Sequence, residues 1–245
     1  MTYDLSEGNQ WWPDFEALEQ MDLSGVKIMW TNYPNMPTGA PATEELYARL
    51  VDFGKRHGIL ICNDNPYSFI LNDNPISILS QPGAMECCLE LNSLSKAHNM
   101  AGWRVGMVAA EADVIAQILK VKSQMDSGMF KPLQLAAVQA LKQGPEWFTE
   151  LNAEYARRRV LAGEIFNLLG AEYDHDSSGM FLWGKVGAAG QALSDRILYE
   201  AGVFITPGFI FGKNGEDYIR ISLCAKPEVL KKAADRIRKA FYIND

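Results

Sequence analysis

Basic residues are in short supply in this 245-residue chain, which has 23 lysines and arginines against 30 aspartates and glutamates. The formal net charge of −7 argues against nucleic acid as a partner, because a nucleic-acid backbone selects a basic face. Histidine is scarce as well, and His57, His98 and His175 are too scattered to indicate a metal site. We therefore expect a protein that binds neither nucleic acid nor a structural metal.

Long apolar runs are also lacking, and none is long enough to span a bilayer. The first residues have neither a basic region nor an apolar core, so they do not resemble a signal peptide. The four cysteines lie mostly within apolar runs, and the adjacent pair Cys87 and Cys88 suits neither a structural disulfide nor C-x-x-C metal spacing. We expect reduced core cysteines in a cytoplasmic protein without membrane contact.

With 48% hydrophobic residues, the chain is long enough for a core and two domains. The succession of strand 26–31, helix 43–57 and strand 59–62 predicts a βαβ unit and hence an α/β fold with a mostly parallel sheet. Thr43 is expected to cap the helix and Gly58 to end it. Further strands are expected at 85–91, 105–110, 180–186, 203–206 and 217–223, and helices at 13–21, 112–125, 132–143, 145–169, 191–201 and 227–242.

After Gly170 the predicted elements change from helices to short strands mixed with helices, which indicates a second domain. Residues 1–144 are predicted to form a partial large domain with flanking helices. Residues 145–245 are predicted to form a long connecting helix and a small C-terminal α+β domain. The basic cluster Arg157-Arg158-Arg159 is expected on a solvated face of that helix.

The segment between the predicted strands 85–91 and 105–110 carries residues suited to chemistry. Lys96 is expected on a loop, where its amine can form a Schiff base with a carbonyl if its pKa is lowered. Ser93, Ser95 and Arg104 suit phosphate oxygens. Gly102 is expected to let the backbone bend between the lysine and the arginine.

Other polar residues follow neighbouring strands. Asp64 and Tyr67 come after strand 59–62, and Lys96 and the proline-rich loop 32–39 also follow strands. Because ligands of open α/β sheets bind outside the carboxyl ends of the strands, these residues are predicted to converge on one sheet edge.

Four motifs in order resemble those of class I/II aminotransferases of fold type I, which use pyridoxal 5′-phosphate (PLP). The run from Ser93 to Arg104 matches the pattern S-x-S-K followed by G-x-R. Asn32 to Gly39 resembles N-P-x-N-P-T-G, Asp64 to Tyr67 resembles D-x-x-Y, and Tyr218 to Ser222 resembles the carboxylate-binding arginine strand. The similarity is greatest to the branch with histidinol-phosphate, LL-diaminopimelate and aspartate aminotransferases.

The resemblance implies a role for each matching residue. Lys96 would form a Schiff base with PLP and then move a proton between the substrate Cα and the cofactor's C4′. Asp64 would keep the pyridine nitrogen protonated, and Tyr67 would donate a hydrogen bond to the phenolic O3′. The phosphate would be held by Ser93, Ser95 and Arg104, and the substrate α-carboxylate by Arg220.

Met36 departs from the family pattern, which usually has asparagine directly before Pro-Thr-Gly to donate to O3′. A thioether cannot donate a hydrogen bond. Tyr67 would then hold O3′ alone, or Asn35 or Asn32 would reach it through a shifted backbone. We expect Met36 to alter the protonation of the lysine-bound cofactor.

The resemblance implies a homodimeric aminotransferase that moves an amino group between an amino acid and a 2-oxo acid. A C–S lyase or related enzyme of the same fold and an inactive, N-terminally truncated remnant are open alternatives. Family members are longer and carry a glycine-rich phosphate loop and a ring-stacking aromatic residue ahead of their N-P-x-N-P-T-G loop, whereas 31 residues precede Asn32 here. A fragment, a misplaced start and one half of a split enzyme are all compatible with this, and the substrate side chain stays undetermined.

Overall fold

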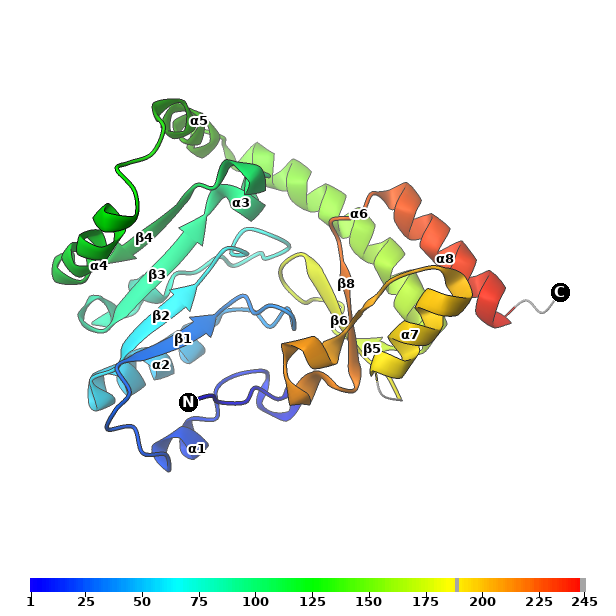
Figure 1. The fold of residues 1–245 in the computed structure, drawn as a ribbon, viewed down its shortest axis with the longest axis horizontal. Helices are drawn as coiled ribbons and strands as arrows, with labels where there is room; N and C mark the ends of the chain where they lie inside the picture. Colours follow the sequence, from blue (N-terminus) through cyan, green and yellow to red (C-terminus); the bar gives the residue numbers. More distant parts are fainter. Residues whose placement is uncertain (188–189, 243–245) are drawn as a thin grey trace. The chain divides into compact units, whose positions relative to one another are not determined.

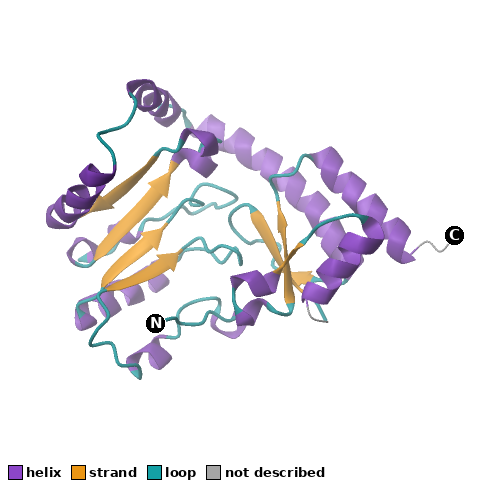
Figure 2. Ribbon diagram, in the orientation of Figure 1, coloured by secondary structure: helices purple, strands orange, loops and turns teal. Residues whose placement is uncertain are grey.

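The computed structural model describes residues 1–187 and 190–242, which form two compact units (Figures 1 and 2). The β1–β4 unit comprises Asp14–Pro34 and Pro41–Thr149. The β5–β8 unit comprises Met1–Pro13, Asn35–Ala40 and the chain from Glu150 onward. The predicted domain division between residues 144 and 145 stays a prediction. The two compact units are defined by contacts, and they group two N-terminal segments with the C-terminal part.

The β1–β4 unit contains a four-stranded sheet in the order β1-β2-β3-β4. The first three strands are parallel and β4 is antiparallel to β3, so the prediction of a mostly parallel sheet is confirmed. Its strands are β1 (Ile28–Asn32), β2 (Leu60–Asp64), β3 (Cys88–Ser93) and β4 (Gly106–Ala110). Its helices are α1 (Phe15–Glu19), α2 (Glu44–His57), α3 (Leu94–Ala97), α4 (Ala112–Met125) and α5 (Lys131–Leu141). Short 3₁₀ turns lie at Ile78–Ser80, Ala84–Glu86 and Ala101–Trp103.

Helix α2 covers one face of this sheet, and its ends are those that the sequence predicts. The Thr43 hydroxyl accepts the Leu46 N–H at 3.0 Å, and Gly58 ends the helix in the left-handed region with φ +62°. A Cβ on Gly54 would lie 2.9 Å from the Ile59 carbonyl oxygen, so the absent side chain allows the close approach of α2 to the start of β2. The helix buries Leu46, Tyr47, Leu50, Val51 and Phe53.

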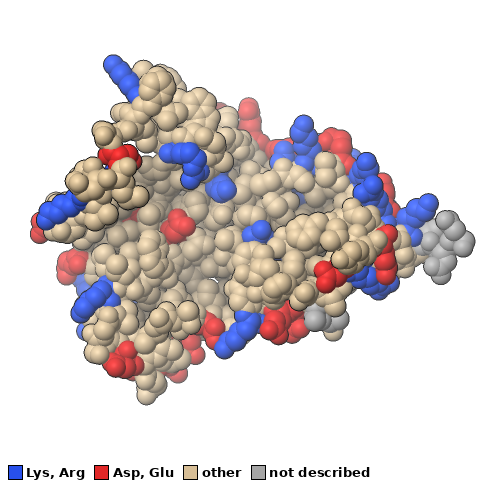
Figure 3. Space-filling model, in the orientation of Figure 1, with Lys and Arg blue, Asp and Glu red and all other residues tan. Residues whose placement is uncertain are grey.

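The opposite face of the sheet is apolar and largely uncovered. Ile28 and Trp30 alternate with buried residues along β1 and are 50% and 61% exposed. Together with α4, which has no buried residue, this face borders a groove of about 640 Å³. Figure 3 shows that the surface over these strands carries few charged side chains.

The β5–β8 unit contains a second sheet, which is antiparallel and has the order β5-β6-β8-β7. Its strands are β5 (Glu172–Tyr173), β6 (Phe181–Lys185), β7 (Thr206–Pro207) and β8 (Tyr218–Ser222). The long helix α6 (Pro145–Leu169) begins in the β1–β4 unit, and its part from Glu150 onward contributes buried residues here. Helices α7 (Gly190–Ala201) and α8 (Pro227–Tyr242) do so as well. Further 3₁₀ turns lie at Glu7–Asn9, Gly208–Phe211 and Lys213–Gly215.

The prediction of a solvated face holds for one of the three arginines on α6: Arg157 is exposed and pairs with Glu154, whereas the other two bind backbone carbonyl groups. Arg158 donates to the carbonyl oxygens of Leu223 and Cys224 at 3.1 and 3.3 Å. Arg159 donates to those of His175 and Ser177. These two guanidinium groups therefore anchor the chain around the small sheet, a role that local sequence patterns do not reveal.

The cysteines follow the prediction in part. Cys62, Cys87 and Cys88 are free and buried, and burial raises the pKa of the Cys62 thiol to about 11. Cys224 is exposed, so the expectation of a core residue is wrong there. Within the described residues, the helices are all too short or too polar to cross a membrane.

Candidate active site

The pairing register of the β1–β4 unit brings Asn32, Asp64 and the strand that leads to Lys96 to one edge of the sheet. Asn32 at the end of β1 lies opposite Asp64 at the end of β2, which in turn lies opposite Leu91 of β3. The Asn32 amide also donates to the Asp64 carbonyl oxygen at 2.7 Å. The chain of β3 then continues directly into the turn that carries Lys96. The predicted convergence of these strand ends is thus present in this unit.

Lys96 lies in a one-turn helix, α3, and not on the irregular loop that the sequence predicts. Two contacts fix this turn from the first turn of α6, where the Trp147 indole N–H donates to the Ala97 carbonyl oxygen at 2.8 Å. The Trp147 ring is nearly parallel to that of His98, with centroids 6.5 Å apart. Burial lowers the pKa of His98, which therefore favours the neutral imidazole. Lys96 is half-buried on a turn that these two contacts hold in place.

Asp64 ends β2 with a solvent-exposed side chain, yet the surrounding protein partly desolvates its carboxyl group and raises its pKa. A cation beside it would reverse this shift by favouring the carboxylate. Tyr67, three residues further on, is only 8% exposed. The end of β2 thus carries a carboxyl group whose charged form a cation would stabilise, and it is followed by the phenol of Tyr67.

The phosphate-binding candidates flank the same turn. Ser93 pairs with Gly106 across β3 and β4, and the Leu94 N–H donates to the Val105 carbonyl oxygen at 3.1 Å. Ser93 and Arg104 are therefore brought to the two sides of one strand end, with Ser95 in the turn between them. Ser93 and Ser95 are half-buried, whereas Arg104 is exposed and donates to the Ala101 carbonyl oxygen at 2.8 Å.

The bend before β4 is made by residues other than the predicted glycine. Asn99 and Arg104 have positive φ values of 53° and 56°, whereas Gly102 lies in a 3₁₀ turn with open space around it. Asparagine tolerates the left-handed region better than most residues, but an arginine there is unusual. This conformation at Arg104 was not foreseeable from its residue type.

A buried polar network beneath the sheet edge was missed by sequence reasoning. Asn63 accepts from the Thr31 hydroxyl at 3.1 Å and donates to the Tyr47 hydroxyl at 3.0 Å and to the Glu90 carboxylate at 3.4 Å. Tyr47 in turn donates to the Tyr33 carbonyl oxygen at 3.2 Å. Satisfied buried networks are rigid, so this one fixes the ends of β1 and β2. Its members come from different elements, and no local sequence motif reveals it.

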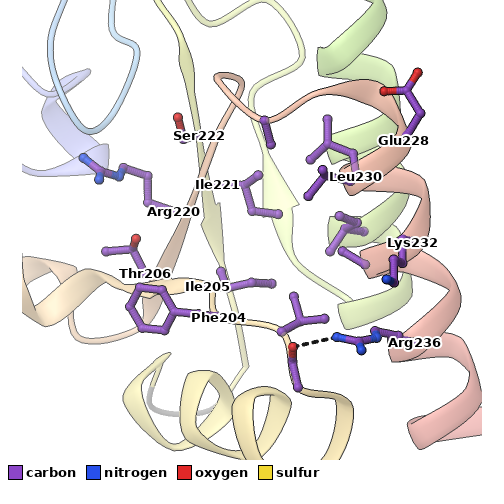
Figure 4. Close-up of a pocket in the computed structure, with 16 residues that line it drawn as sticks. Phe204, Ile205, Thr206, Arg220, Ile221, Ser222, Glu228, Leu230, Lys232 and Arg236 are labelled. Atoms are coloured by element: carbon purple, nitrogen blue, oxygen red, sulfur yellow. Dashed lines mark hydrogen bonds between the residues drawn. The ribbon is translucent and has the colours of Figure 1, made fainter.

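Arg220 lies on β8 in the β5–β8 unit. Figure 4 shows Arg220 and Ile221 pointing to opposite sides of β8, with Ile221 directed toward Leu230 of α8. Both line a cavity of about 700 Å³ within this unit. The Arg220 guanidinium contacts the Met36 sulfur, with Nη1 and Sδ 3.2 Å apart.

Asn35 belongs to the same unit, and its side-chain oxygen is engaged locally. The Thr38 hydroxyl donates to Asn35 Oδ1 at 2.7 Å. This bond stabilises the turn of loop 35–40, so the structure gives the Asn35 oxygen a role within the loop.

Comparison with known proteins identifies the family of the chain. The profile of the family "Aminotransferase class I and II" matches residues 1–237. The chain belongs to the class I and II aminotransferase family. Its members depend on PLP, and the resemblance and fold predicted from the motifs are thereby confirmed.

Individual relatives give the extent of the match. An LL-diaminopimelate aminotransferase of Natranaerobius thermophilus is 39% identical over 241 residues, which are 97% of this chain and 62% of that protein. Apo-BacF from Bacillus subtilis is 34% identical with a TM-score of 0.90, and the match covers 97% of this chain and 62% of that structure. A probable N-succinyldiaminopimelate aminotransferase from Thermus thermophilus is 30% identical with a TM-score of 0.89, covering 98% and 65%. The chain thus spans slightly less than two thirds of these proteins.

The residues of the β1–β4 unit fit the PLP of this family in their chemistry. A lysine amine can bond to its aldehyde, and a carboxylate with a raised pKa can pair with its ring nitrogen. Two hydroxyls and a guanidinium around one turn suit its phosphate. The family's asparagine donor to O3′ is replaced by Met36, which cannot donate.

Proposed function

We propose that this chain carries the lysine-bearing part of a PLP-dependent aminotransferase, which moves an amino group between an amino acid and a 2-oxo acid. The observation that supports it most is the strand register, which aligns Asn32, Asp64 and the approach to Lys96 at one sheet edge. Family membership supports the same reaction class.

The three residues nearest the reacting atoms would have distinct roles. When bound, PLP supplies the aldehyde that takes up the amino group and the ring that withdraws electrons from the substrate Cα. Lys96 would anchor the cofactor and move the proton at Cα, because a half-buried amine on a fixed turn can accept and return it. Asp64 would keep the ring nitrogen protonated, and Tyr67 would orient the ring through O3′.

The remaining residues would bind the polar and charged groups of the cofactor and the substrate. Ser93, Ser95 and Arg104 would hold the cofactor phosphate, since hydroxyl and guanidinium donors form charge-assisted hydrogen bonds with its oxygens. Arg220 would bind the substrate α-carboxylate through paired N–H donors. Asn35 remains a candidate for the O3′ side of the cofactor through its amide nitrogen.

The substrate, assembly and location belong to the same proposal. The relative named as an LL-diaminopimelate aminotransferase makes LL-diaminopimelate the first amino donor to test. A homodimer is inferred from the family resemblance. A cytoplasmic location is supported by the three buried, free thiols.

An isotope-transfer assay tests the proposal. The purified chain would be incubated with PLP, 2-oxoglutarate and ¹⁵N-labelled LL-diaminopimelate or other amino acids, and ¹⁵N-glutamate would be measured. Transfer is expected in the wild type and in the exposed-helix control Lys120→Ala, and its loss is expected in Lys96→Ala. Release of ammonia and pyruvate from a cysteine conjugate would instead indicate a C–S lyase, and no turnover of any kind would reject activity for this chain.

A further inference from the structure

Met36 contacts the residue proposed to bind the substrate carboxylate. Besides the 3.2 Å contact between Met36 Sδ and Arg220 Nη1, the guanidinium carbon of Arg220 lies over the Phe181 ring at 4.3 Å and the Phe211 ring at 4.6 Å. A thioether is a weak hydrogen-bond acceptor, and an aromatic face attracts a cation. These three groups are uncharged, so their contacts orient the guanidinium without adding an opposite charge beside it.

We propose that Met36 is a positioning residue for Arg220, and that substrate carboxylates meet a guanidinium held by a thioether sulfur and two aromatic rings. This inference rests on the proposed function and explains how the side chain of its carboxylate-binding residue is oriented. A guanidinium recognises a carboxylate through N–H donors in its own plane. Contacts to its faces and to one nitrogen therefore fix the plane in which a carboxylate is bound.

Loop 35–40 holds Met36 in place. The Asn35 N–H donates to the Ala40 carbonyl oxygen, and the Gly39 N–H donates to that of Asn35, both at 2.8 Å. Gly39 has φ +77°, and a Cβ there would lie 2.6 Å from the Ser177 Cβ. The loop therefore requires glycine at this position and has a defined shape.

The support extends to α6 through residues 175–178. The Ser178 N–H donates to the Gly39 carbonyl oxygen at 2.8 Å. Arg159 of α6 donates to the carbonyl oxygens of His175, at 3.1 Å, and Ser177. A continuous series of hydrogen bonds thus leads from α6 to the loop that places the Met36 sulfur against Arg220.

Side-chain NMR of Arg220 tests the proposal without requiring cofactor or turnover. Met36→Leu keeps the side-chain volume but removes the acceptor, and Met36→Gln restores an acceptor at similar reach. Met85→Leu changes a 44% exposed methionine of the other unit and serves as the matched control. The Arg220 Nε–Hε signal would be assigned by its loss in Arg220→Lys.

The signal is expected to show a ring-current shift in the wild type, to move toward its random-coil position in Met36→Leu, and to return in Met36→Gln. Maleate, which has carboxylates but no amine, would be titrated into each protein. Its dissociation constant is expected to rise about threefold in Met36→Leu, the size of effect typical of one weak hydrogen bond, and to recover in Met36→Gln.

Two results would overturn the positioning role. One is an Arg220 signal and a maleate affinity that Met36→Leu leaves unchanged, and the other is a wild-type protein that does not bind maleate. Absence of a PLP adduct together with the expected NMR changes would reject the proposed function and keep the positioning role. Where turnover is present, Met36→Leu should raise KM for the amino acid and leave kcat within about twofold of the wild type.

Discussion

The two units differ in how completely their sheets are covered. In the β5–β8 unit, α6, α7 and α8 bury Phe166, Ile197 and Ile237, each with 0% exposure. In the β1–β4 unit, α2 covers one face, whereas α4 buries no residue and the apolar groove beside it stays open (Figure 3). The small sheet thus has its packing partners within the described residues, and the large sheet lacks partners on one face.

The less covered unit nevertheless carries most of the chemistry. Asp64, Ser93 and Lys96 are placed there by strand register and by the buried network around Asn63. The network joins the strands to Tyr47 of α2, the helix on the covered face of the sheet. The geometry of the strand ends therefore depends on backbone pairing and on one packed face of the sheet.

The largest effect is expected from removing a core aromatic side chain. Phe166→Ala in the covered unit should lower the free energy of unfolding by about 3–5 kcal/mol, because it leaves a cavity. Phe130→Ala, at a position 69% exposed in the other unit, should change it by less than about 0.5 kcal/mol. Urea unfolding followed by circular dichroism measures both. Equal losses in the two variants would remove the contrast between the units.

A charged side chain in the open groove should reduce the binding of apolar molecules to it. Val121 of α4 lines the groove and Val160 of α6 does not, although both are 65% exposed. Val121→Glu should roughly halve the binding of an apolar fluorescent dye and delay aggregation, because it interrupts an exposed apolar patch. Val160→Glu should leave both unchanged. The groove would not be a distinct surface if the two variants behaved alike.

Asp64→Asn should have a smaller effect that depends on pH. Because desolvation raises the pKa of the folded carboxyl, its contribution to stability is present below the unfolded pKa of about 3.9 and is lost as the pH rises through the folded value. The uncharged variant should therefore melt about 1–2 °C higher than the wild type at pH 7 and at nearly the same temperature at pH 3.5. It should also bind PLP more weakly, since it cannot pair with a protonated ring. A wild type that is the more stable protein at pH 7 would contradict the desolvation argument.

Met36→Asn should change the cofactor spectrum most subtly. An amide donor to O3′ favours the form with more negative charge on that oxygen, so the apparent pKa of the lysine-bound PLP chromophore should fall by up to about one unit. The measurement is a pH titration of the absorbance of the bound cofactor, with Met36→Leu as the control. An unchanged titration would show that Met36 does not affect O3′.

Much of this fold follows from local sequence signals. Helices α4, α6 and α8 have the predicted bounds, and Thr43 and Gly58 delimit α2 because caps and left-handed glycines act within one turn. The strands are also found, with ends shifted by a few residues. The two-residue strand β5 was missed because so short a segment shows no alternation.

The features that escaped prediction depend on residues far apart in the chain. The half-buried turn of Lys96 is fixed by Trp147, which lies 51 residues later in the sequence. Arg159 was taken for a surface residue, but its partners lie in the loop before β6. The contact between Met36 and Arg220 joins two motifs that sequence reasoning treated separately.

Trapping the adduct with borohydride shows whether Lys96 is the lysine that binds the cofactor. The purified chain would be mixed with PLP, its visible spectrum recorded, and the adduct reduced with borohydride and located by peptide mapping. We expect a visible absorption band and a label on Lys96, both of which Lys96→Ala abolishes and Lys120→Ala retains. A chain without such a band, or with label scattered over exposed lysines, would contradict this role of Lys96.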